Sequence, residues 1–206
     1  MTRNKKWALI AGIFIFLLTA LFVFVKIPRL VPEKRIKADD ISAYLKDGDI
    51  ICRLGDRLWS LYFKDVSVTD KRFSHLGIIR IFGGKITVIN AEGRAIQGKD
   101  FVNEVGLDEF LEIAKAVGIY RLIDYDGKIV SSAALEYVGY PFDWSFDLED
   151  KSKIYCTELL YVILTKIAPE IETKKIFQKE LKKEIIPLEA YSNSEHFSEI
   201  LYVSAN

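Results

Sequence analysis

Hydrophobic residues follow three different patterns along this chain, and the longest uninterrupted run lies near the N-terminus. Trp7 to Val25 is an uncharged apolar segment of 19 residues. As a helix it would be about 29 Å long at 1.5 Å per residue, which is enough to cross a bilayer. A cleaved signal peptide is the alternative, but its apolar core is usually about 7 to 15 residues and precedes a small-residue cleavage site, whereas Lys26 and Pro28 follow here. We therefore expect residues 7–25 to form an uncleaved transmembrane signal anchor.

From residue 38 onward, shorter runs alternate between the period of a strand and the period of a helix. The predicted strands gather in the middle of the chain, with helices on either side. This pattern predicts one α+β domain over residues 38–206, in which an antiparallel sheet packs against the helix that begins near Cys156. The expected helices are 40–45, 57–63, one from 108, 127–137, one from 156 and 173–183, and the expected strands are 49–54, 76–82, 85–91, 118–123 and 200–203.

Two β-rich runs, 76–82 and 85–91, are separated only by a pair of glycines. Such a pair predicts a tight two-residue turn. Continued along both strands, the register of that turn places Glu92 opposite His75, with Asn90 on the same face. Directly opposed residues have Cβ atoms roughly 5 Å apart, so the carboxylate can orient the imidazole ring. A β-bulge would shift the register by one residue and turn Glu92 to the other face.

The third pattern begins at Cys156, where a polar stretch gives way to residues spaced as on a helix. Its thiol is therefore expected at a helix N-terminus, where the positive end of the helix dipole favours the thiolate. The same spacing puts Cys156 in phase with Leu159, Leu160 and Ile163. A merely packed cysteine is thus the alternative, because free cysteine is among the most buried residue types. Cys52 alternates with apolar neighbours and is expected in the core.

Four short motifs occur in an order that resembles one known family. They are Gly48 to Gly55 (GDIICRLG), Ser74 to Ile79 (SHLGII), Tyr140 to Trp144 (YPFDW) and Tyr155 to Leu159 (YCTEL). Together they are similar to the YiiX-like permuted papain-fold family, which belongs with the NlpC-like and lecithin:retinol acyltransferase-like thiol enzymes. The mark of that family is a histidine that precedes the cysteine, and this chain has that order over about residues 46–203.

The resemblance implies a permuted papain-like (NlpC-like) fold and a cysteine mechanism. Carried over by position, it makes Cys156 the nucleophile, His75 the general base and Glu92 the residue that orients the base. The substrate-binding residues that we expect near the nucleophile are Trp144, Asp143 and Tyr155.

The chain departs from the family pattern at two positions. The family usually has serine after the cysteine and often tyrosine after the proline, whereas this chain has Thr157 and Phe142. Thr157 keeps a hydroxyl group, but Phe142 lacks one. If a phenol there helps to hold the oxyanion in relatives, the backbone N–H of Cys156 carries more of that task here.

Charge divides the chain and restricts the possible partners. Residues 1–37 hold 8 of the 29 Lys and Arg residues and 1 of the 29 Asp and Glu residues, which leaves 21 basic against 28 acidic residues in 38–206. An acidic domain disfavours binding to nucleic acid. The two cysteines and two histidines form no zinc pattern and no glycine-rich phosphate loop is present, so we expect neither metal nor cofactor.

The N-terminal charges bear on membrane orientation. Residues 1–6 form a short basic tail and residues 26–37 a basic linker. Basic residues thus flank the apolar run on both sides, but a short basic tail before a first apolar segment is the usual signal-anchor arrangement. We expect a single-pass membrane protein whose catalytic domain lies on the periplasmic or extracellular side.

Three functions are compatible with these residues. The leading one is a membrane-anchored thiol hydrolase of amide or ester bonds, acting on a small molecule, a cell-wall peptide or a lipid-linked substrate. The second is a lipid acyltransferase or thioesterase that uses the same residues and has an apolar groove. The third is a binding module without catalysis, in which Cys156 is buried.

Overall fold

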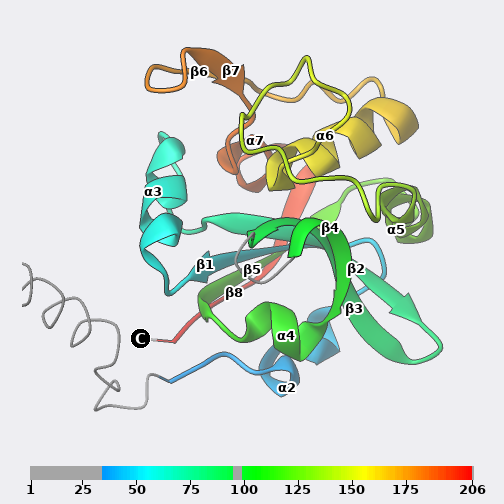
Figure 1. Ribbon diagram of the computed structural model, residues 1–206. Helices are drawn as coiled ribbons and strands as arrows, with labels where there is room; N and C mark the ends of the chain where they lie inside the picture. Colours follow the sequence, from blue (N-terminus) through cyan, green and yellow to red (C-terminus); the bar gives the residue numbers. More distant parts are fainter. Residues whose placement is uncertain (1–33, 95–98, 206) are drawn as a thin grey trace, which may run out of the picture. The chain divides into compact units, whose positions relative to one another are not determined.

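An antiparallel sheet forms the centre of this computed structural model, which describes residues 34–94 and 99–205 (Figure 1). Within those residues the sheet has six strands in the order β4-β3-β2-β1-β5-β8. They are β1 (Ile50–Gly55), β2 (His75–Phe82), β3 (Lys85–Arg94), β4 (Lys99–Gly106), β5 (Ala114–Leu122) and β8 (Phe197–Ser204). A separate hairpin consists of β6 (Ile176–Gln178) and β7 (Lys183–Ile185).

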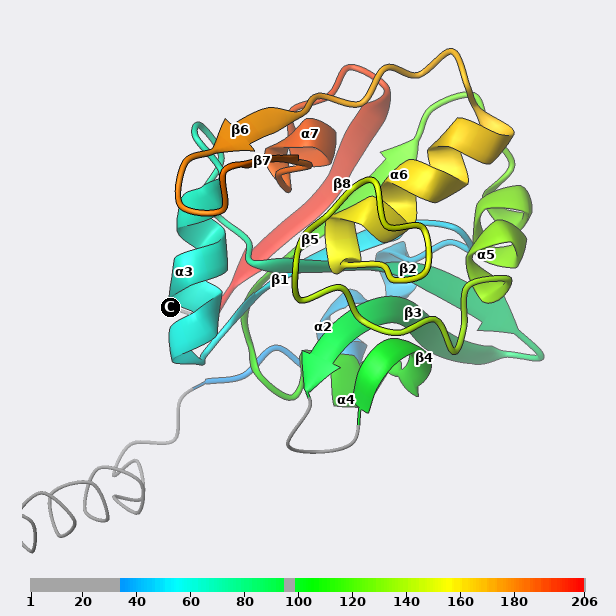
Figure 2. The same ribbon diagram turned by 45° about the horizontal axis from the view of Figure 1, so that its top comes forward.

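Helices cover both faces of this sheet (Figures 1 and 2). One face carries α5 (Gly127–Leu135), α6 (Cys156–Ile167) and α7 (Glu189–Ser192). The other carries α2 (Ala38–Ile41), the 3-10 turn η1 (Ser42–Tyr44) and α4 (Leu107–Leu111), while α3 (Leu58–Val66) follows β1. The predicted α+β class, with an antiparallel sheet packed on the helix that begins at Cys156, is confirmed.

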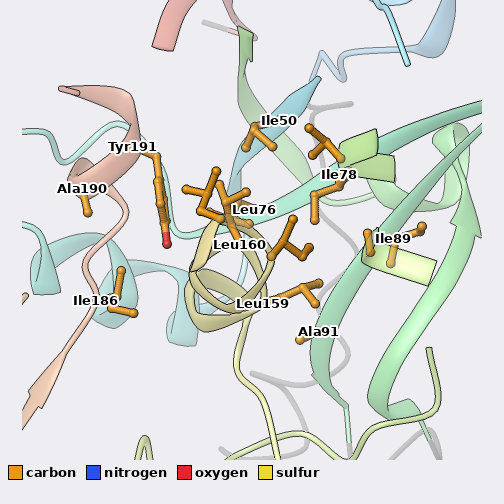
Figure 3. Packing of buried hydrophobic residues seen from close by; sticks show 14 of the residues in the cluster. Ile50, Leu76, Ile78, Ile89, Ala91, Leu159, Leu160, Ile186, Ala190 and Tyr191 are labelled. Atoms are coloured by element: carbon orange, nitrogen blue, oxygen red, sulfur yellow. The ribbon is translucent and has the colours of Figure 1, made fainter. Parts of the chain in front are cut away.

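Two hydrophobic clusters, one on each face, hold these layers together. On the α6 side, Leu159 and Leu160 of the helix pack on Leu76 and Ala91 of the sheet (Figure 3), and all four side chains are fully buried. Complete burial of one leucine contributes about 1.5–3 kcal/mol. These contacts therefore fix α6 on β2 and β3, and with it the position of the residue at its N-terminus.

The turn predicted from the paired glycines is confirmed. Gly83 and Gly84 have φ angles of 58° and 78°, the left-handed region that a two-residue type I′ turn requires at both positions. From this turn the β2–β3 ladder follows the predicted register as far as Ile78, which faces Ile89.

Beyond that point the ladder does not reach the predicted pair. His75 is paired with Arg53 of β1, and Glu92 belongs to the ladder between β3 and β4. Among the described pairs, the β2–β3 ladder thus ends before His75 and Glu92. The N-terminus of α6 lies at this opening, where the backbone N–H of Leu76 is near enough to the sulfur of Cys156 to lower the pKa of the thiol.

The helix predicted over residues 173–183 is wrong, because this segment forms the β6–β7 hairpin. Phe177 and Leu181 are four positions apart, a spacing typical of one helical face, but in the structure Phe177 lies exposed on β6. In the hairpin Ile176 pairs with Ile185, whose side chain is buried. Lys182 takes a positive φ of 53° in the turn between the strands.

Strand β4 has a polar sequence that gives little signal for a strand. It forms because both of its edges are occupied. One side pairs with β3 along the whole strand, and on the other the N–H of Val102 donates to the carbonyl oxygen of Tyr140 at 2.8 Å. Backbone pairing on two sides therefore replaces side-chain propensity here.

None of the helices in the described ranges is long and apolar enough to span a membrane. The predicted anchor over residues 7–25, the basic tail over 1–6 and most of the linker over 26–37 lie outside those ranges.

We expect Leu160→Ala to lower the free energy of unfolding by about 2–5 kcal/mol, because it leaves a cavity between α6 and the sheet. Urea unfolding of the purified protein measures this loss. Thr165→Ala on the exposed side of the same helix is the control and should change stability by less than about 0.5 kcal/mol. A loss at Leu160 no larger than that of the control would contradict the packing described here.

Candidate active site

Cys156 is the first residue of α6, as predicted from the sequence. Its neighbour Tyr155 has extended backbone angles (φ −99°, ψ 171°) and is the N-cap residue. The backbone N–H groups of Leu76, Thr157 and Cys156 itself lie near enough to the sulfur to lower the pKa of the thiol. The thiol thus lies beside the N–H donors of the first turn of α6 and the first residues of β2.

Burial nevertheless dominates the titration of this thiol. It raises the pKa of Cys156 from 9.0 to about 11, although the three N–H groups and the positive charge of Arg53 lower it. Cys156 is therefore protonated at neutral pH in the free protein, and attack on a substrate requires a base.

His75 is held by a chain of hydrogen bonds that crosses the sheet. Its Nε2 lies 2.9 Å from Oδ1 of Asn90, and Nδ2 of Asn90 donates to Oδ1 of Asn103, also at 2.9 Å. Because the amide nitrogen of Asn90 is directed to Asn103, the amide oxygen faces the imidazole and can only accept. In the neutral ring Nε2 therefore carries the proton, and Nδ1 is the basic nitrogen.

Asn90 is a site residue that the sequence interpretation did not select. The sequence did contain a signal for Asn90, because it precedes Glu92 by two residues and therefore lies on the same face of β3. Glu92 Oε1 accepts a hydrogen bond from Arg53 Nη2 at 2.6 Å. The orienting role of Glu92 toward His75 stays a prediction.

Arg53 and His75 share one aromatic support, Phe110 of α4. The His75 ring lies 5.8 Å from the Phe110 ring between centroids, and the guanidinium carbon of Arg53 lies 4.3 Å from the same ring. Arg53 also donates from Nη1 to the carbonyl oxygen of Phe110. The imidazole and the guanidinium group are thus held side by side on the α4 face of the sheet.

A cavity of about 530 Å³ connects these groups, and we call it the thiol cavity. Cys156, His75 and Glu92, the three predicted catalytic residues, all line it, together with Arg53 and Arg57. Most of the remaining wall is apolar or aromatic. This part consists of Tyr62, Phe63, Val66, Ile113, Phe142, Trp144, Phe146, Tyr155, Leu181, Ile185, Ile186, Pro187 and Leu188.

Of the three predicted substrate-binding residues, Trp144 and Tyr155 line the thiol cavity and Asp143 does not. Asp143 is completely buried. Its Oδ1 accepts from the N–H of Ser145 at 2.8 Å, and its Oδ2 accepts from the N–H of Asp147 at 2.5 Å. The structure therefore gives Asp143 a structural part, which is to fold the loop that carries Trp144.

Trp144 forms the part of the wall next to β3. Its indole Nε1 lies 2.9 Å from Oδ1 of Asp100, and its ring packs edge-on against Phe142 with centroids 4.9 Å apart. A Cβ atom added at Gly93 would come within 2.7 Å of the Trp144 ring. Only glycine at this position lets the ring lie so close to the strand.

The opposite wall, residues 185–188, is tied to the first turn of α6. The N–H of Ile186 donates to the hydroxyl oxygen of Tyr155 at 3.0 Å, and the hydroxyl of Thr157 donates to the carbonyl oxygen of Ile186 at 2.6 Å. Tyr191 donates to the carbonyl oxygen of Thr157 at 2.8 Å. The hydroxyl that Thr157 retains thus joins the thiol helix to the cavity wall.

One buried carboxyl group near the thiol takes no part in these contacts. Glu158 has no exposed surface, and neither of its oxygens reaches hydrogen-bond geometry with a described residue. Burial raises its pKa from 4.5 to about 7, with the charges of Asp143 and Asp147 acting in the same direction, while the nearby N–H of Tyr155 and the charge of Lys151 lower it. The group is therefore partly protonated at neutral pH.

In residues 34–94 and 99–205, no group of three or more His, Cys, Asp or Glu side chains is arranged to hold a metal ion. The arrangement that the structure does present is a thiol, an imidazole with a fixed tautomer and several N–H donors around one largely apolar cavity. Chemically, this set can attack a carbonyl carbon and hold the resulting acyl group.

Comparison with known proteins gives one family and one fold. The model of a family described as "Permuted papain-like amidase enzyme, YaeF/YiiX, C92 family" matches residues 44–193. Among solved structures, the metalloprotein yiiX from Escherichia coli O157:H7 is similar, with a TM-score of 0.63 and 15% sequence identity over 77% of this chain and 98% of that chain. No curated protein matches. The structural likeness supports the predicted permuted papain-like fold.

We expect the stability of the protein to fall as the pH rises from about 4.5 to about 7, because folded Glu158 holds its proton more tightly than unfolded Glu158 over this range. Above that range the loss is complete, and it amounts to at most about 3 kcal/mol of the free energy of unfolding. Glu158→Gln should remove this decrease, as measured by urea unfolding at a series of pH values.

Glu149→Gln, at an exposed position in the loop that precedes α6, is the matched control and should leave the decrease in place. A Glu158→Gln variant with the pH dependence of the wild type would show that this carboxyl group titrates normally.

Proposed function

Because the chain belongs to the family of permuted papain-like amidases, we propose that it is a cysteine hydrolase that cleaves amide or ester bonds through an acyl-enzyme on Cys156. The observation that carries this proposal is that Cys156 and His75 line one cavity, with backbone N–H donors around the sulfur. A cysteine that was only packed in the core would not need such donors. This arrangement favours catalysis over the binding module.

In the proposed reaction, Nδ1 of His75 takes the proton of the Cys156 thiol as the sulfur attacks the carbonyl carbon. The negative charge that develops on the carbonyl oxygen is stabilised by the backbone N–H of Cys156. His75 then gives its proton to the leaving amine or alcohol. Water, activated by the same imidazole, attacks the thioester and releases the acid.

A base is required because the thiol is protonated at rest. With a pKa of about 11, only about one molecule in ten thousand would carry a thiolate at pH 7. The fixed Nε2–H tautomer of His75 leaves Nδ1 as the acceptor for the thiol proton. Asn90 thus acts as a positioning residue for the base.

The wall of the thiol cavity supports a substrate with an apolar part next to the scissile bond. Aromatic side chains from three segments, including Phe63, Phe142 and Phe146, line it. Lipid-linked amides or cell-wall peptides fit this description, and a membrane anchor at residues 7–25 would hold the domain near such substrates. We propose that the protein is a single-pass membrane protein with its catalytic domain outside.

The apolar cavity also favours a second candidate, an acyltransferase or thioesterase that uses the same residues. In that case an alcohol or amine replaces water in the second step. Assays with an added acceptor separate the two: acyl transfer to the acceptor supports the second candidate, and release of the free acid alone supports the hydrolase.

Mass spectrometry of the intact protein tests the proposal directly. Incubated with activated acyl esters of short and long chain, the wild type should gain the mass of one acyl group, and hydroxylamine should remove it. Cys156→Ala should prevent the adduct, whereas Cys52→Ala, which changes the fully buried cysteine, should not. An unreactive wild type, with Cys156 also inert to iodoacetamide, would favour the binding module.

We expect Asn90→Ala to lower kcat/KM by about 10- to 100-fold, because His75 loses the contact that fixes its tautomer. Asn90→Asp keeps an acceptor at this position and should retain most of the activity at pH 7. Steady-state kinetics on an acyl ester measures both variants. Equal losses in the two would indicate damage to the fold instead of the loss of a positioning contact, and thermal unfolding distinguishes these cases.

A further inference from the structure

A buried arginine lies beside the reacting pair. Only 2% of Arg53 is exposed, although it is charged and lines the thiol cavity. It is paired with His75 across the β1–β2 ladder, and both side chains lie against Phe110. Its charge also acts on Cys156 and favours the thiolate. Arg53 thus places a permanent positive charge next to the base and in the same cavity as the nucleophile.

Glu92 forms an ion pair with this arginine. The 2.6 Å contact between Oε1 and Nη2 is well sheltered from water, with side-chain exposures of 12% for Glu92 and 3% for Arg53. Removing one partner of such a pair leaves an uncompensated buried charge, so the pair acts as an electrostatic unit.

We propose that Arg53 is the fixed positive charge that stabilises the Cys156 thiolate, and that Glu92 is the counter-ion of Arg53, which allows His75 to become protonated beside it. This inference rests on the proposed function, because it assigns roles within the same reaction. It makes Arg53 and Glu92 positioning residues that act through charge.

The charge balance explains why both residues are needed. Transfer of a proton from Cys156 to His75 creates one thiolate and one imidazolium. The imidazolium forms next to Arg53, and two adjacent cations destabilise each other. Glu92 offsets the arginine charge, so the four groups together are neutral before and after the transfer.

The counter-ion role and the orienting role of Glu92 predict opposite effects when its charge is removed. If Glu92 served only to orient and support the imidazolium, its loss would weaken the base and disfavour the thiolate. If Glu92 is the counter-ion, its loss leaves the full charge of Arg53 acting on the sulfur and favours the thiolate.

Glu92→Gln is the variant that separates these roles, because glutamine keeps the shape and can still accept from Arg53. The full-length protein, with Cys52→Ala in every variant, is alkylated with iodoacetamide over a range of pH. We expect the apparent pKa of Cys156 to fall by about one unit and alkylation below that pKa to become about tenfold faster. An unchanged or higher pKa would overturn the inference.

Arg53 supplies a second, independent test. Arg53→Met should raise the apparent pKa of the thiol and slow alkylation at pH 7 about tenfold or more, whereas Arg53→Lys keeps the charge and should stay close to the wild type. Methionine leaves Glu92 buried without its partner, so the double variant with Glu92→Gln is the control for folding. It should alkylate faster than Arg53→Met, and a slower reaction would count against the charge balance.

Other ionisable groups near the thiol remain the same in all these variants. They are His75 on β2, Arg57 at the start of α3, Tyr155 before α6, Glu158 on α6 and Tyr191 on α7, while Cys52 is alanine throughout. Differences in the titration of Cys156 therefore report the Arg53–Glu92 pair.

Alkylation needs no substrate turnover, so the inference can be judged apart from the proposed hydrolase. If Glu92→Gln speeds alkylation while the wild type cleaves no ester or amide, the charge roles stand and the hydrolase fails. If the wild type hydrolyses esters but Glu92→Gln slows alkylation, the hydrolase stands and the counter-ion role fails. In an active enzyme, Glu92→Gln should lower kcat while alkylation becomes faster.

Discussion

The candidate site depends on how α6 is buried against the middle of the sheet. Leu159 and Leu160 lock the helix onto the face that contains Leu76 and Ala91. This packing directs the N-terminus of the helix to the end of the β2–β3 ladder. There the N–H of Leu76, a residue beyond the end of the β2–β3 ladder, lies near enough to the sulfur of Cys156 to lower the pKa of the thiol.

This placement matters because the thiol of Cys156 and the imidazole of His75 come from opposite faces of one sheet. Leu76 faces α6, whereas His75, the preceding residue, points to the side of α4 and packs on Phe110. Side chains of adjacent strand residues point to opposite faces. The thiol and the imidazole can therefore share a cavity only at an end of β2, where the α6 N-terminus meets the sheet.

The electrostatics of the site is a balance of two opposing effects. A helix N-terminus stabilises a nearby negative charge by about 0.3–1 kcal/mol, and the N–H groups at the sulfur add to this. Removal of the thiol from water acts against both and is the larger effect at Cys156. The resting thiol is consequently neutral, and reactivity depends on the groups that face it from β1, β2 and β3.

The sequence by itself determined the elements that local patterns specify. The two-residue turn at Gly83 and Gly84, the start of a helix at Cys156 and the core position of Cys52 all follow from turn chemistry and periodicity within a few residues. The order of His75 before Cys156 was also readable from the chain alone. The β6–β7 hairpin could not be predicted in this way, because its pairing depends on the burial of Ile185 in the folded domain.

Only the tertiary structure decided which polar groups lie next to His75. The register of the turn places Glu92 opposite His75, but the β2–β3 ladder ends at Ile78 and Ile89. Nε2 of His75 lies 2.9 Å from Oδ1 of Asn90, and Glu92 accepts a hydrogen bond from Arg53. Asp143, expected in the pocket, is instead buried within its loop. These contacts form between segments that are far apart in the sequence. A local sequence pattern carries no information about the distance between two such side chains in the folded protein.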